Sequence, residues 1–250
     1  MKYSFQLYSA RNFTPWDQIF RSVSALGYSQ VEGFGALYEN PAETRASLDT
    51  HNLSMPSGHF SLDDLENNLA TVLKTADTLG CENIFCPYLD ESIRPSDDKG
   101  WQDFGRRLNE LNKRVTDAGK RFGWHNHDFE FQPCDDGSVP MRSILTSAPD
   151  IDWEMDVAWV ARAGTDPVPW ITEFGKRISA VHIKDIAEQG SCEDEDGWAD
   201  VGAGILDWQA LLTQITKETN ASLFVAEHDN PSDHERFARQ SIESMKKFTG

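Results

Sequence analysis

Short runs of apolar and β-branched residues alternate along the whole chain with longer segments of helical periodicity. The apolar runs begin near Tyr3, Tyr28, Leu53, Asn83, Phe122, Ile151, Ile178 and Leu223. Each run has the length of a buried strand, and each is followed by a segment in which apolar residues return every three or four positions. Eight strand signals, each followed by a helix signal, predict a mostly parallel sheet with crossover helices.

The helical segments carry residues that typically begin and end helices. TPWDQIFRSVSAL has Thr14 as a candidate N-cap and Pro15 at the first helical position, and SLDDLENNLATVLKTADTLG begins at Ser61. WQDFGRRLNELNKRVTDAG places its apolar residues on one face. A glycine suited to a left-handed cap ends each of these three segments, at Gly27, Gly80 and Gly119. Further helices are predicted from about Asp166, Asp207 and Asp233, with weaker candidates at residues 41–51 and around Met141.

The number of units favours one particular α/β architecture. Eight βα units in 250 residues match the usual size of a (β/α)8 TIM barrel. An open doubly wound sheet would normally bind a nucleotide through a Gly-rich first turn, but the first predicted strand ends in QLYSARN, without glycine. The segment VGAGILDW lacks the third glycine of a dinucleotide-binding motif. We therefore predict a single (β/α)8 barrel domain over residues 1–250.

Composition narrows the class of partner. The chain has 23 basic and 41 acidic residues and a net charge of −18, which repels nucleic-acid phosphates and anionic membranes. The four cysteines form no CxxC pair, which is typical of reduced thiols. The N-terminal residues do not form a secretory signal, and no apolar run approaches the ~18 residues of a membrane span. We expect a cytoplasmic protein without a nucleic-acid or membrane partner.

Residues that bind metals or transfer protons are concentrated where the predicted strands end. They are Glu32, His59, His125, His127, Glu130, Glu154, Asp156, His182, Lys184, Asp185, Glu227, His228 and Asp229. In a (β/α)8 barrel the C-terminal strand ends carry the chemistry. Because only alternate residues of a barrel strand point inward, Glu154 and Asp156 share one face, as do His182 and Lys184.

This residue set predicts a metal site. Two or three carboxylates and one imidazole, with few thiolates, suit one divalent ion such as Mn, Mg, Co or Zn. We predict Glu130, Asp156, His182 and Glu227 as its ligands, one from each of four consecutive strand ends. A single carboxylate at a strand end is more often a helix cap or an ion-pair partner. Four such residues at one rim favour the metal site.

Six segments resemble, in the same order, the sugar phosphate isomerase/epimerase group of xylose isomerase-like TIM barrels. They are QLYSARN, GWHNHDFEF, WEMDVAWVARAGTDP, AVHIKD, DVGAGILDW and FVAEHD. Relatives in this group include tagatose 3-epimerase, hydroxypyruvate isomerase, inosose dehydratase and endonuclease IV. Such proteins hold one divalent ion through Glu, Asp, His and Glu from successive strands. The resemblance assigns the last three ligands to Asp156, His182 and Glu227.

The first ligand departs from the family pattern. Some relatives have Glu at the end of this strand, where the present chain has His125 or His127, and Glu130 comes slightly later. The resemblance therefore leaves His127 as an alternative ligand or as a substrate contact.

The resemblance implies an isomerase or epimerase that moves a proton at a carbon next to a carbonyl group, through an enediolate that the metal stabilises. It assigns acid–base roles to Glu130 and Glu227, while His59 and Lys184 would bind hydroxyls or move protons between oxygens. The polar segment 188–204 follows the seventh predicted strand and is predicted to be a lid over the same rim. The predicted substrate contacts are Glu32, His125, His127, Trp198 and Asp200.

Three other functions remain open at this point. A dehydratase or lyase would use the same metal and the same base. A nuclease similar to endonuclease IV is disfavoured by the charge of −18. A barrel that binds a sugar without catalysis is disfavoured by the intact Asp156, His182 and Glu227. The strand ends show no phosphate-binding glycine turn or arginine cluster, which favours an uncharged carbohydrate substrate. Relatives are often dimers or tetramers, so a homo-oligomer is compatible with the resemblance.

Overall fold

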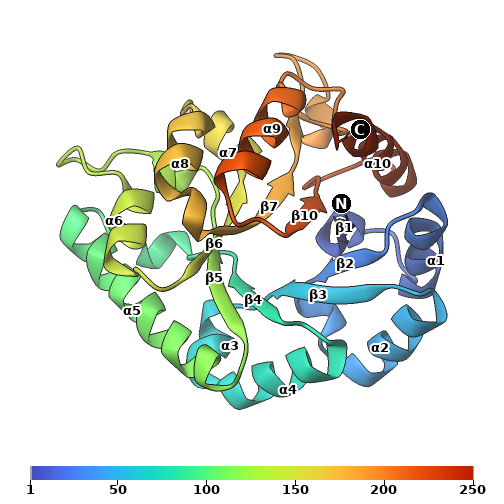
Figure 1. The fold of residues 1–250 in the computed structure, drawn as a ribbon, viewed down its shortest axis with the longest axis horizontal. Coiled ribbons are helices and arrows are strands. Elements are labelled where there is room, and N and C mark those ends of the chain that lie inside the picture. Colours follow the sequence, from blue (N-terminus) through green and yellow to red (C-terminus); the bar gives the residue numbers. More distant parts are fainter. Residues whose placement is uncertain (1, 250) are drawn as a thin grey trace.

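The eight predicted strand signals become a closed ring of parallel strands. In the computed structural model, which describes residues 2 to 249, the order around the ring is β1, β10, β7, β6, β5, β4, β3 and β2. These strands are β1 (Tyr3–Gln6), β2 (Gln30–Gly33), β3 (Ser54–His59), β4 (Asn83–Cys86), β5 (Arg121–His125), β6 (Asp152–Asp156), β7 (Ile178–Ile183) and β10 (Leu223–Ala226). The predicted (β/α)8 barrel is confirmed (Figure 1).

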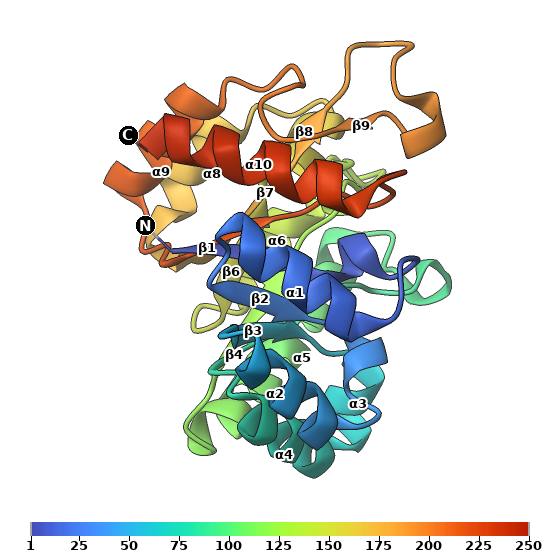
Figure 2. The same ribbon diagram turned by 90° about the vertical axis from the view of Figure 1, so that its right-hand side faces the viewer.

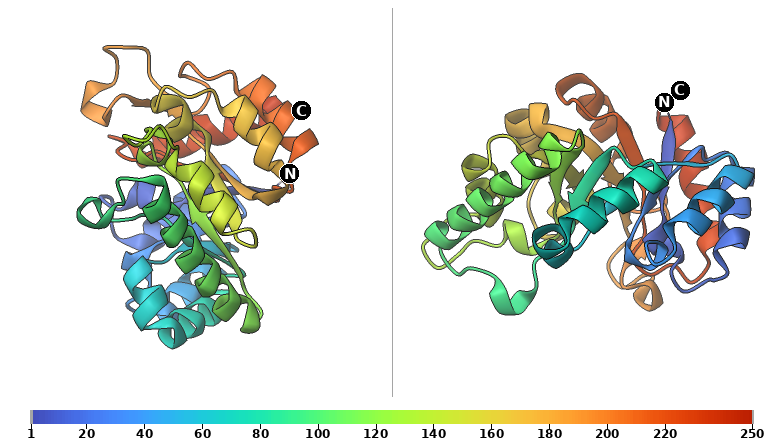
Figure 3. Two further views of the ribbon diagram at one scale, coloured as in Figure 1. Left: turned by 90° about the vertical axis from the view of Figure 1, so that its left-hand side faces the viewer. Right: turned by 90° about the horizontal axis from the view of Figure 1, so that it is seen from below.

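The helices lie outside the ring of strands, as Figure 1 and the two views of Figure 3 show. They are α1 (Trp16–Leu26), α2 (Pro41–Thr50), α3 (Leu62–Asn67), α4 (Leu69–Leu79), α5 (Asp98–Asp117), α6 (Pro140–Ser147), α7 (Val157–Arg162), α8 (Pro167–Phe174), α9 (Trp208–Glu218) and α10 (His234–Thr249). Short 3-10 helices are η1 (Leu7–Ala10), η2 (Gly35–Leu37), η3 (Glu91–Ile93), η4 (Phe129–Phe131), η5 (Gly175–Arg177) and η6 (Glu193–Glu195). Within the described residues, no helix has both the length and the apolar character that a membrane crossing requires.

Helix boundaries differ from the sequence prediction in three places. The N-cap of α1 is Pro15, whose backbone is extended, and not Thr14. The predicted helix after Ser61 is divided into α3 and α4, because Asn68 leaves the helical conformation at a φ of −129°. Helix α5 begins before Trp101, since the Asp97 carboxylate accepts a hydrogen bond from the Gly100 amide at 2.8 Å. The short α7 was not predicted.

The large hydrophobic core fills the space between the strands and the surrounding helices. Its largest buried side chains include Trp124, Trp153 and Phe237. Inside the barrel, a separate small cluster of buried apolar residues comprises Phe85, Ala180, Leu223 and Val225. Polar side chains continue from this cluster toward the C-terminal strand ends, so the barrel interior changes from apolar to charged along its axis.

Gly105 sets the distance between α5 and α6. A Cβ atom at this position would lie 2.8 Å from the Ile144 carbonyl oxygen and 3.0 Å from Cβ of Ser147. Gly105→Ala should therefore lower the free energy of unfolding by about 1–2 kcal/mol, although alanine is the better helix former by about 1 kcal/mol.

Urea unfolding followed by circular dichroism measures this change. Glu110→Ala, at an exposed position of the same helix, is the control and should change stability by at most about 0.5 kcal/mol. An unchanged or increased stability of Gly105→Ala would show that α6 can move away without cost.

Candidate active site

Parallel pairing of the strands brings polar residues to the same level at one end of the barrel. His125 of β5 is level with Glu154 of β6, and Asp156 at the end of β6 is level with His182 of β7. On the other side of the ring, Glu32 of β2 accepts a hydrogen bond from the Gln6 side chain at 2.8 Å. The closed sheet thus turns residues that are far apart in sequence into one polar layer.

His182 is the centre of this layer and is fully buried. Its Nε2 atom lies 2.7 Å from Oε1 of Glu32, and its Nδ1 atom lies 2.8 Å from Oε2 of Glu227. Its ring stacks on that of His59 at 5.4 Å between centroids and lies 4.5 Å from that of His125. One imidazole therefore connects the carboxylate of β2 with the carboxylate that follows β10.

Two overlapping groups of side chains have the geometry to hold a metal ion. In the first group, four donor atoms that all lie within 4.8 Å of one another come from His125, Asp156, His182 and Glu227. In the second group, atoms within the same limit come from His59, His125, Glu154 and His182. The first group takes one residue from each of four neighbouring strand ends. Its two imidazole nitrogens and two carboxylate oxygens suit a first-row transition ion.

The charge balance of the layer also fits a cation. Glu32, Glu154, Asp156 and Glu227 are buried, whereas Lys184 is the one permanent cation found beside them among the described residues. Among the described residues, Oε1 of Glu154 and Oε2 of Glu32 are buried oxygen atoms without a hydrogen-bond partner. Buried carboxylates require compensating charge, because the loss of hydration costs several kcal/mol for each ion. A divalent cation would supply this charge.

Without such an ion, protons on the imidazoles compensate the carboxylates. Burial opposes the protonation of His182, but the adjacent Glu154, Glu227 and Glu32 outweigh burial and raise its pKa well above 6.5. Burial also opposes the protonation of His59, but Glu32 and Glu154 outweigh burial and raise the pKa of His59 above 6.5. The layer can therefore be neutralised by protons or by a metal, and the two compete for the same nitrogens.

Lys184 lies behind the carboxylates and not among the residues that line the cavity. Its Nζ atom is 2.9 Å from Glu227, 2.9 Å from Asp229 and 3.2 Å from Asp156. Burial opposes its charged form, but these carboxylates, with Asp156 first, raise its pKa above 10.5. This placement differs from the predicted contact with substrate hydroxyls, because Lys184 orients carboxylates instead.

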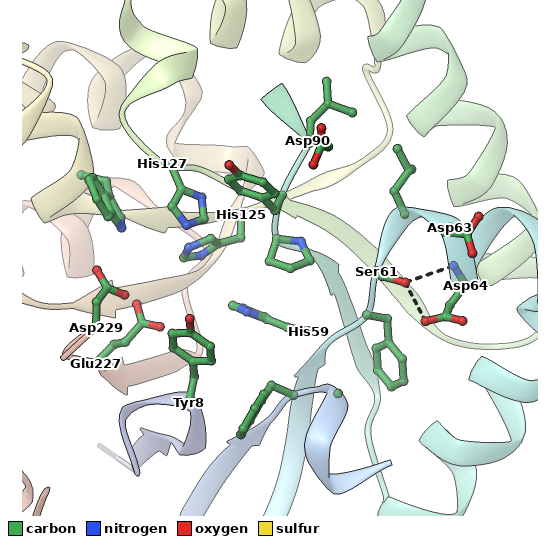
Figure 4. Close-up of a pocket in the computed structure, with 18 of the residues that line it drawn as sticks. Tyr8, His59, Ser61, Asp63, Asp64, Asp90, His125, His127, Glu227 and Asp229 are labelled. Carbon is green, nitrogen blue, oxygen red and sulfur yellow. Dashed lines mark hydrogen bonds between the residues drawn. The ribbon is translucent and has the colours of Figure 1, made fainter. Parts of the chain in front are cut away.

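A cavity of about 1130 Å³ opens above the polar layer. Figure 4 shows Glu227 and Asp229 on one side of it and His59, His125 and His127 around them. The predicted substrate contacts that line this cavity are His125, His127 and Trp198. The predicted contact Glu32 is fully buried among the side chains of the layer and does not line the cavity.

The structure does not bring Glu130 to the site. Its carboxylate accepts hydrogen bonds from Nε1 of Trp124 at 2.8 Å and from the His127 amide at 2.9 Å. Burial raises its pKa to about 8. The 3-10 helix η4 carries Glu130 to the side of β5 on which Trp124 lies, opposite to the side of His125. His125, not Glu130, therefore contributes the donor atom from β5.

Sequence reasoning missed the role of Asn126. Its Oδ1 atom accepts hydrogen bonds from Nε1 of Trp153 at 2.8 Å and from the Asp156 amide at 3.0 Å. Its Nδ2 group donates to the Asp156 carbonyl oxygen at 3.1 Å. Asn126 thereby fastens the end of β6 and orients Asp156. An asparagine between two histidines gave no signal for this bridge, which spans 30 residues.

The predicted lid is a hairpin formed by β8 (Asp185–Ile186) and β9 (Trp198–Ala199), seen beside α10 in Figure 2. Trp198 lines the cavity and packs edge-on against Trp159, with ring centroids 4.7 Å apart. At the start of the hairpin, the Asp185 carboxylate accepts hydrogen bonds from the amides of Gly202 and Gly204 at 2.9 and 3.3 Å. A Cβ atom at Gly204 would lie 2.2 Å from Asp185 Oδ1, which explains the glycine.

Asp200 does not contact the cavity, contrary to the prediction. Its Oδ2 atom accepts a hydrogen bond from Nε of Arg236 in α10 at 2.9 Å. The same guanidinium group donates from Nη2 to Glu195 of η6 at 2.8 Å. Asp200 and Glu195 thus attach both halves of the hairpin to α10. The direction of the chain after Trp198 turns the Asp200 side chain away from the cavity.

Comparison with known proteins identifies the family. The model of the xylose isomerase-like TIM barrel family matches residues 20–248. The chain belongs to this family. The resemblance found in the sequence is therefore confirmed for the xylose isomerase-like barrel.

Three similar proteins illustrate the family. A sugar phosphate isomerase/epimerase from Parabacteroides distasonis superposes with a TM-score of 0.80 at 17% identity, over 98% of this chain and 93% of that protein. The IOLI protein, solved with a zinc atom, has a TM-score of 0.74 at 17% identity, with 100% and 96% covered. The rhizopine catabolism protein MocC of Rhizobium meliloti is 22% identical over 236 residues, which are 82% of this chain and 71% of that protein.

The attachment of the hairpin to α10 should contribute to the free energy of unfolding. Burial opposes the ionisation of Glu195, but hydrogen bonds from Arg236 and Ser232 outweigh it and lower its pKa from 4.5 to about 2. Arg236→Ala should lower the free energy of unfolding by about 1–2 kcal/mol near neutral pH, less than for a fully buried pair because the Arg236 side chain is 40% exposed.

The pH dependence of this effect follows from the lowered pKa of Glu195. A carboxylate with a depressed pKa stabilises the fold above its ordinary pKa of 4.5, and the stabilisation disappears as the pH falls toward 2. The difference between wild type and Arg236→Ala should therefore be constant above about pH 5 and shrink below about pH 4. Urea unfolding across this pH range measures it, with Arg239→Ala on the exposed face of α10 as control. A difference that grows in acid would contradict the assignment.

Proposed function

We propose that the protein is a divalent-metal-dependent isomerase or epimerase of an α-hydroxy carbonyl sugar, either a ketose or an aldose. The observation that carries this proposal is the convergence of donor atoms from His125, Asp156, His182 and Glu227 within 4.8 Å of one another, next to a large cavity. The reaction would move a proton at the carbon next to the carbonyl group, through an enediolate.

Two observations support a metal requirement. The IOLI protein, which has a similar fold, binds a zinc atom. The donor set of two imidazoles and two carboxylates suits manganese, cobalt or zinc better than magnesium, which prefers oxygen ligands. An ion held by these residues would act as a Lewis acid that stabilises negative charge on the enediolate oxygens, by several kcal/mol.

Of the four buried carboxylates of the layer, Glu227 is the best placed to accept the proton, because it lines the cavity and the other three do not. Burial opposes its ionisation, but Lys184 and His182 outweigh burial and hold its pKa well below 4.5. Glu227 is therefore ionised at neutral pH. The ammonium group of Lys184 lies 2.9 Å from its Oε2 atom and fixes the orientation of the carboxylate.

His59 is the second acid–base group, in place of the predicted Glu130. Its Nε2 atom lies 2.7 Å from Oε2 of Glu154, which is buried and holds the imidazole in one orientation. His59 and Glu227 lie on two sides of His182, since the His59 ring stacks on the His182 ring and Glu227 is hydrogen-bonded to Nδ1 of His182. This arrangement offers proton-transfer groups from two directions, as an epimerase requires.

The two tryptophans of the cavity shield the charged layer from water. Nζ of Lys184 lies 5.2 Å from the ring centroid of Trp159 and 4.7 Å from that of Trp198. Arg162 covers the Trp198 ring at 4.2 Å and donates a hydrogen bond to the Asp196 carbonyl oxygen at 2.9 Å. A closed, drier site strengthens every electrostatic interaction inside it.

The metal proposal distinguishes His125 from Glu130. Wild-type protein incubated with Mn²⁺ or Zn²⁺ and freed of excess metal should retain about one ion per chain. His125→Ala, Asp156→Asn and His182→Ala should each weaken metal binding about tenfold or more, whereas Glu130→Gln should retain it. Inductively coupled plasma mass spectrometry gives the metal content, and circular dichroism checks the fold. Loss of metal in Glu130→Gln together with retention in His125→Ala would refute the ligand set.

Proton transfer is tested in deuterated water. Metal-loaded wild type should introduce deuterium at the carbon next to the carbonyl group of at least one sugar in a panel of ketoses and aldoses, measured by NMR. Glu227→Gln should slow this exchange by about 10²–10⁴-fold, whereas the matched variant Glu130→Gln should not. Exchange at the wild-type rate in Glu227→Gln would exclude Glu227 as the base. Release of a leaving group in place of sugar interconversion would assign the site to a lyase.

A further inference from the structure

The cavity extends well beyond the charged layer. It has a volume of about 1130 Å³, whereas pockets for drug-sized ligands span roughly 300–1,000 Å³. Figure 4 shows Glu227 and Asp229 at one end and Ser61, Asp63 and Asp64 at the other. A single sugar ring held next to Glu227 would therefore leave the far end of the cavity unfilled.

Apolar side chains are exposed preferentially around this cavity. Among the described residues, the large hydrophobic side chains that remain exposed are Tyr8, Tyr88, Ile93, Val168 and Ile205. Three of these five line the cavity, namely Tyr8 (38% exposed), Tyr88 (46%) and Ile93 (56%). Apolar surface that gathers at one place, and not singly over the molecule, marks a binding surface.

A continuous aromatic wall runs along the cavity from Tyr88 to Trp198. The Tyr88 ring lies 5.4 Å from that of His127, and the His127 ring lies 5.3 Å from that of Trp159, which packs on Trp198. Tyr88 is supported from behind by Arg94, whose guanidinium carbon lies 5.1 Å from its ring centroid. Tyr88 is therefore an oriented platform next to the site and not an incidental surface residue.

Carboxylate side chains also line this cavity. The outer part of the cavity is lined by Ser61, Asp63, Asp64 and Asp90. The Asp64 carboxylate accepts a hydrogen bond from the Ser61 hydroxyl group, whose oxygen in turn accepts one from the Asp64 amide. The Asp90 carboxylate accepts a hydrogen bond from the Ser92 amide. Each carboxylate keeps further acceptor positions, because an ionised carboxylate has about four. Arg107, which also lines the cavity, is paired with Glu66, so the negative charge of the three aspartates is left in excess and disfavours an anionic ligand group.

The combination of an aromatic face and acceptor carboxylates fits one kind of ligand group. A neutral sugar ring presents C–H groups on its faces, which pack on aromatic rings, and hydroxyl groups at its edge, which donate to carboxylates. An aromatic ligand group would offer no hydroxyl donors to the remaining acceptor positions of Asp63, Asp64 and Asp90. A phosphate group would meet three negative charges.

We propose that the substrate is a glycoside with at least two neutral sugar rings, and that its second ring occupies an outer subsite formed by Tyr88, Ile93, Asp63, Asp64 and Asp90. The first ring lies at the charged layer, so that this assignment rests on the proposed isomerase or epimerase function. The second ring stacks on Tyr88 and directs its hydroxyl groups to the carboxylates.

Binding measurements with defined sugars test the outer subsite. Isothermal titration of the metal-loaded full chain would use glucose, cellobiose, maltose and 4-nitrophenyl glucoside. At least one disaccharide should bind about tenfold more tightly than glucose, equivalent to about 1.4 kcal/mol. Tyr88→Ala should abolish this preference without changing the affinity for glucose. Ile205→Ala, which removes an exposed apolar side chain outside the cavity, should leave the preference unchanged.

Three results would overturn the subsite. They are equal or weaker binding of every disaccharide relative to glucose, a preference that survives in Tyr88→Ala, or tighter binding of the aryl glucoside than of both disaccharides. Binding does not require turnover, so the disaccharide preference is measured independently of deuterium exchange. A retained preference without deuterium exchange in any sugar would refute the proposed function and leave the subsite. Deuterium exchange in monosaccharides, without tighter binding of any disaccharide, would support the proposed function and refute the subsite.

Discussion

The need to compensate buried carboxylates governs the C-terminal end of this barrel. Glu32, Glu154, Asp156 and Glu227 are removed from water, and Lys184 and the imidazoles of His59, His125 and His182 lie among them. A buried carboxylate without a counter-charge costs several kcal/mol, which a barrel could avoid by continuing its apolar interior. The apolar cluster that includes Phe85 shows that the same barrel does so at lower levels. The charged layer is therefore costly to the fold, and the remaining core offsets this cost.

The structure supports this layer from three sides. Asn126 bridges β5 and β6 and fixes the backbone of Asp156. Lys184 joins Asp156, Glu227 and Asp229 from behind. The β8–β9 hairpin, attached to α10 through Arg236, supplies Trp198 above the layer. Because each support comes from a different part of the chain, the site is held by the tertiary structure as a whole and not by any one loop.

Strand alternation decides the orientation of those predicted site residues that lie on regular strands. Asp156 is the last residue of β6 and His182 the last but one of β7, and the inward direction of their side chains follows from the two-residue period. Glu130 lies beyond the strand, in a 3-10 helix, where this period no longer applies. Strand alternation places His125 inward, where its donor atom lies near those of Asp156 and His182. Asp200 likewise lies beyond a regular strand, since it follows the short β9, and its carboxylate accepts hydrogen bonds from Arg236.

The sequence by itself determined the eight βα units, most helix ends and the strands that deliver Asp156, His182 and Glu227, because these features depend on local periodicity and capping. Only the tertiary structure decided that His125 and not Glu130 joins them, that Lys184 supports carboxylates, and that Tyr88 continues the wall formed by His127 and Trp159. These outcomes depend on contacts between residues tens of positions apart, whose geometry is set by the closure of the barrel and by irregular turns that no periodic pattern encodes.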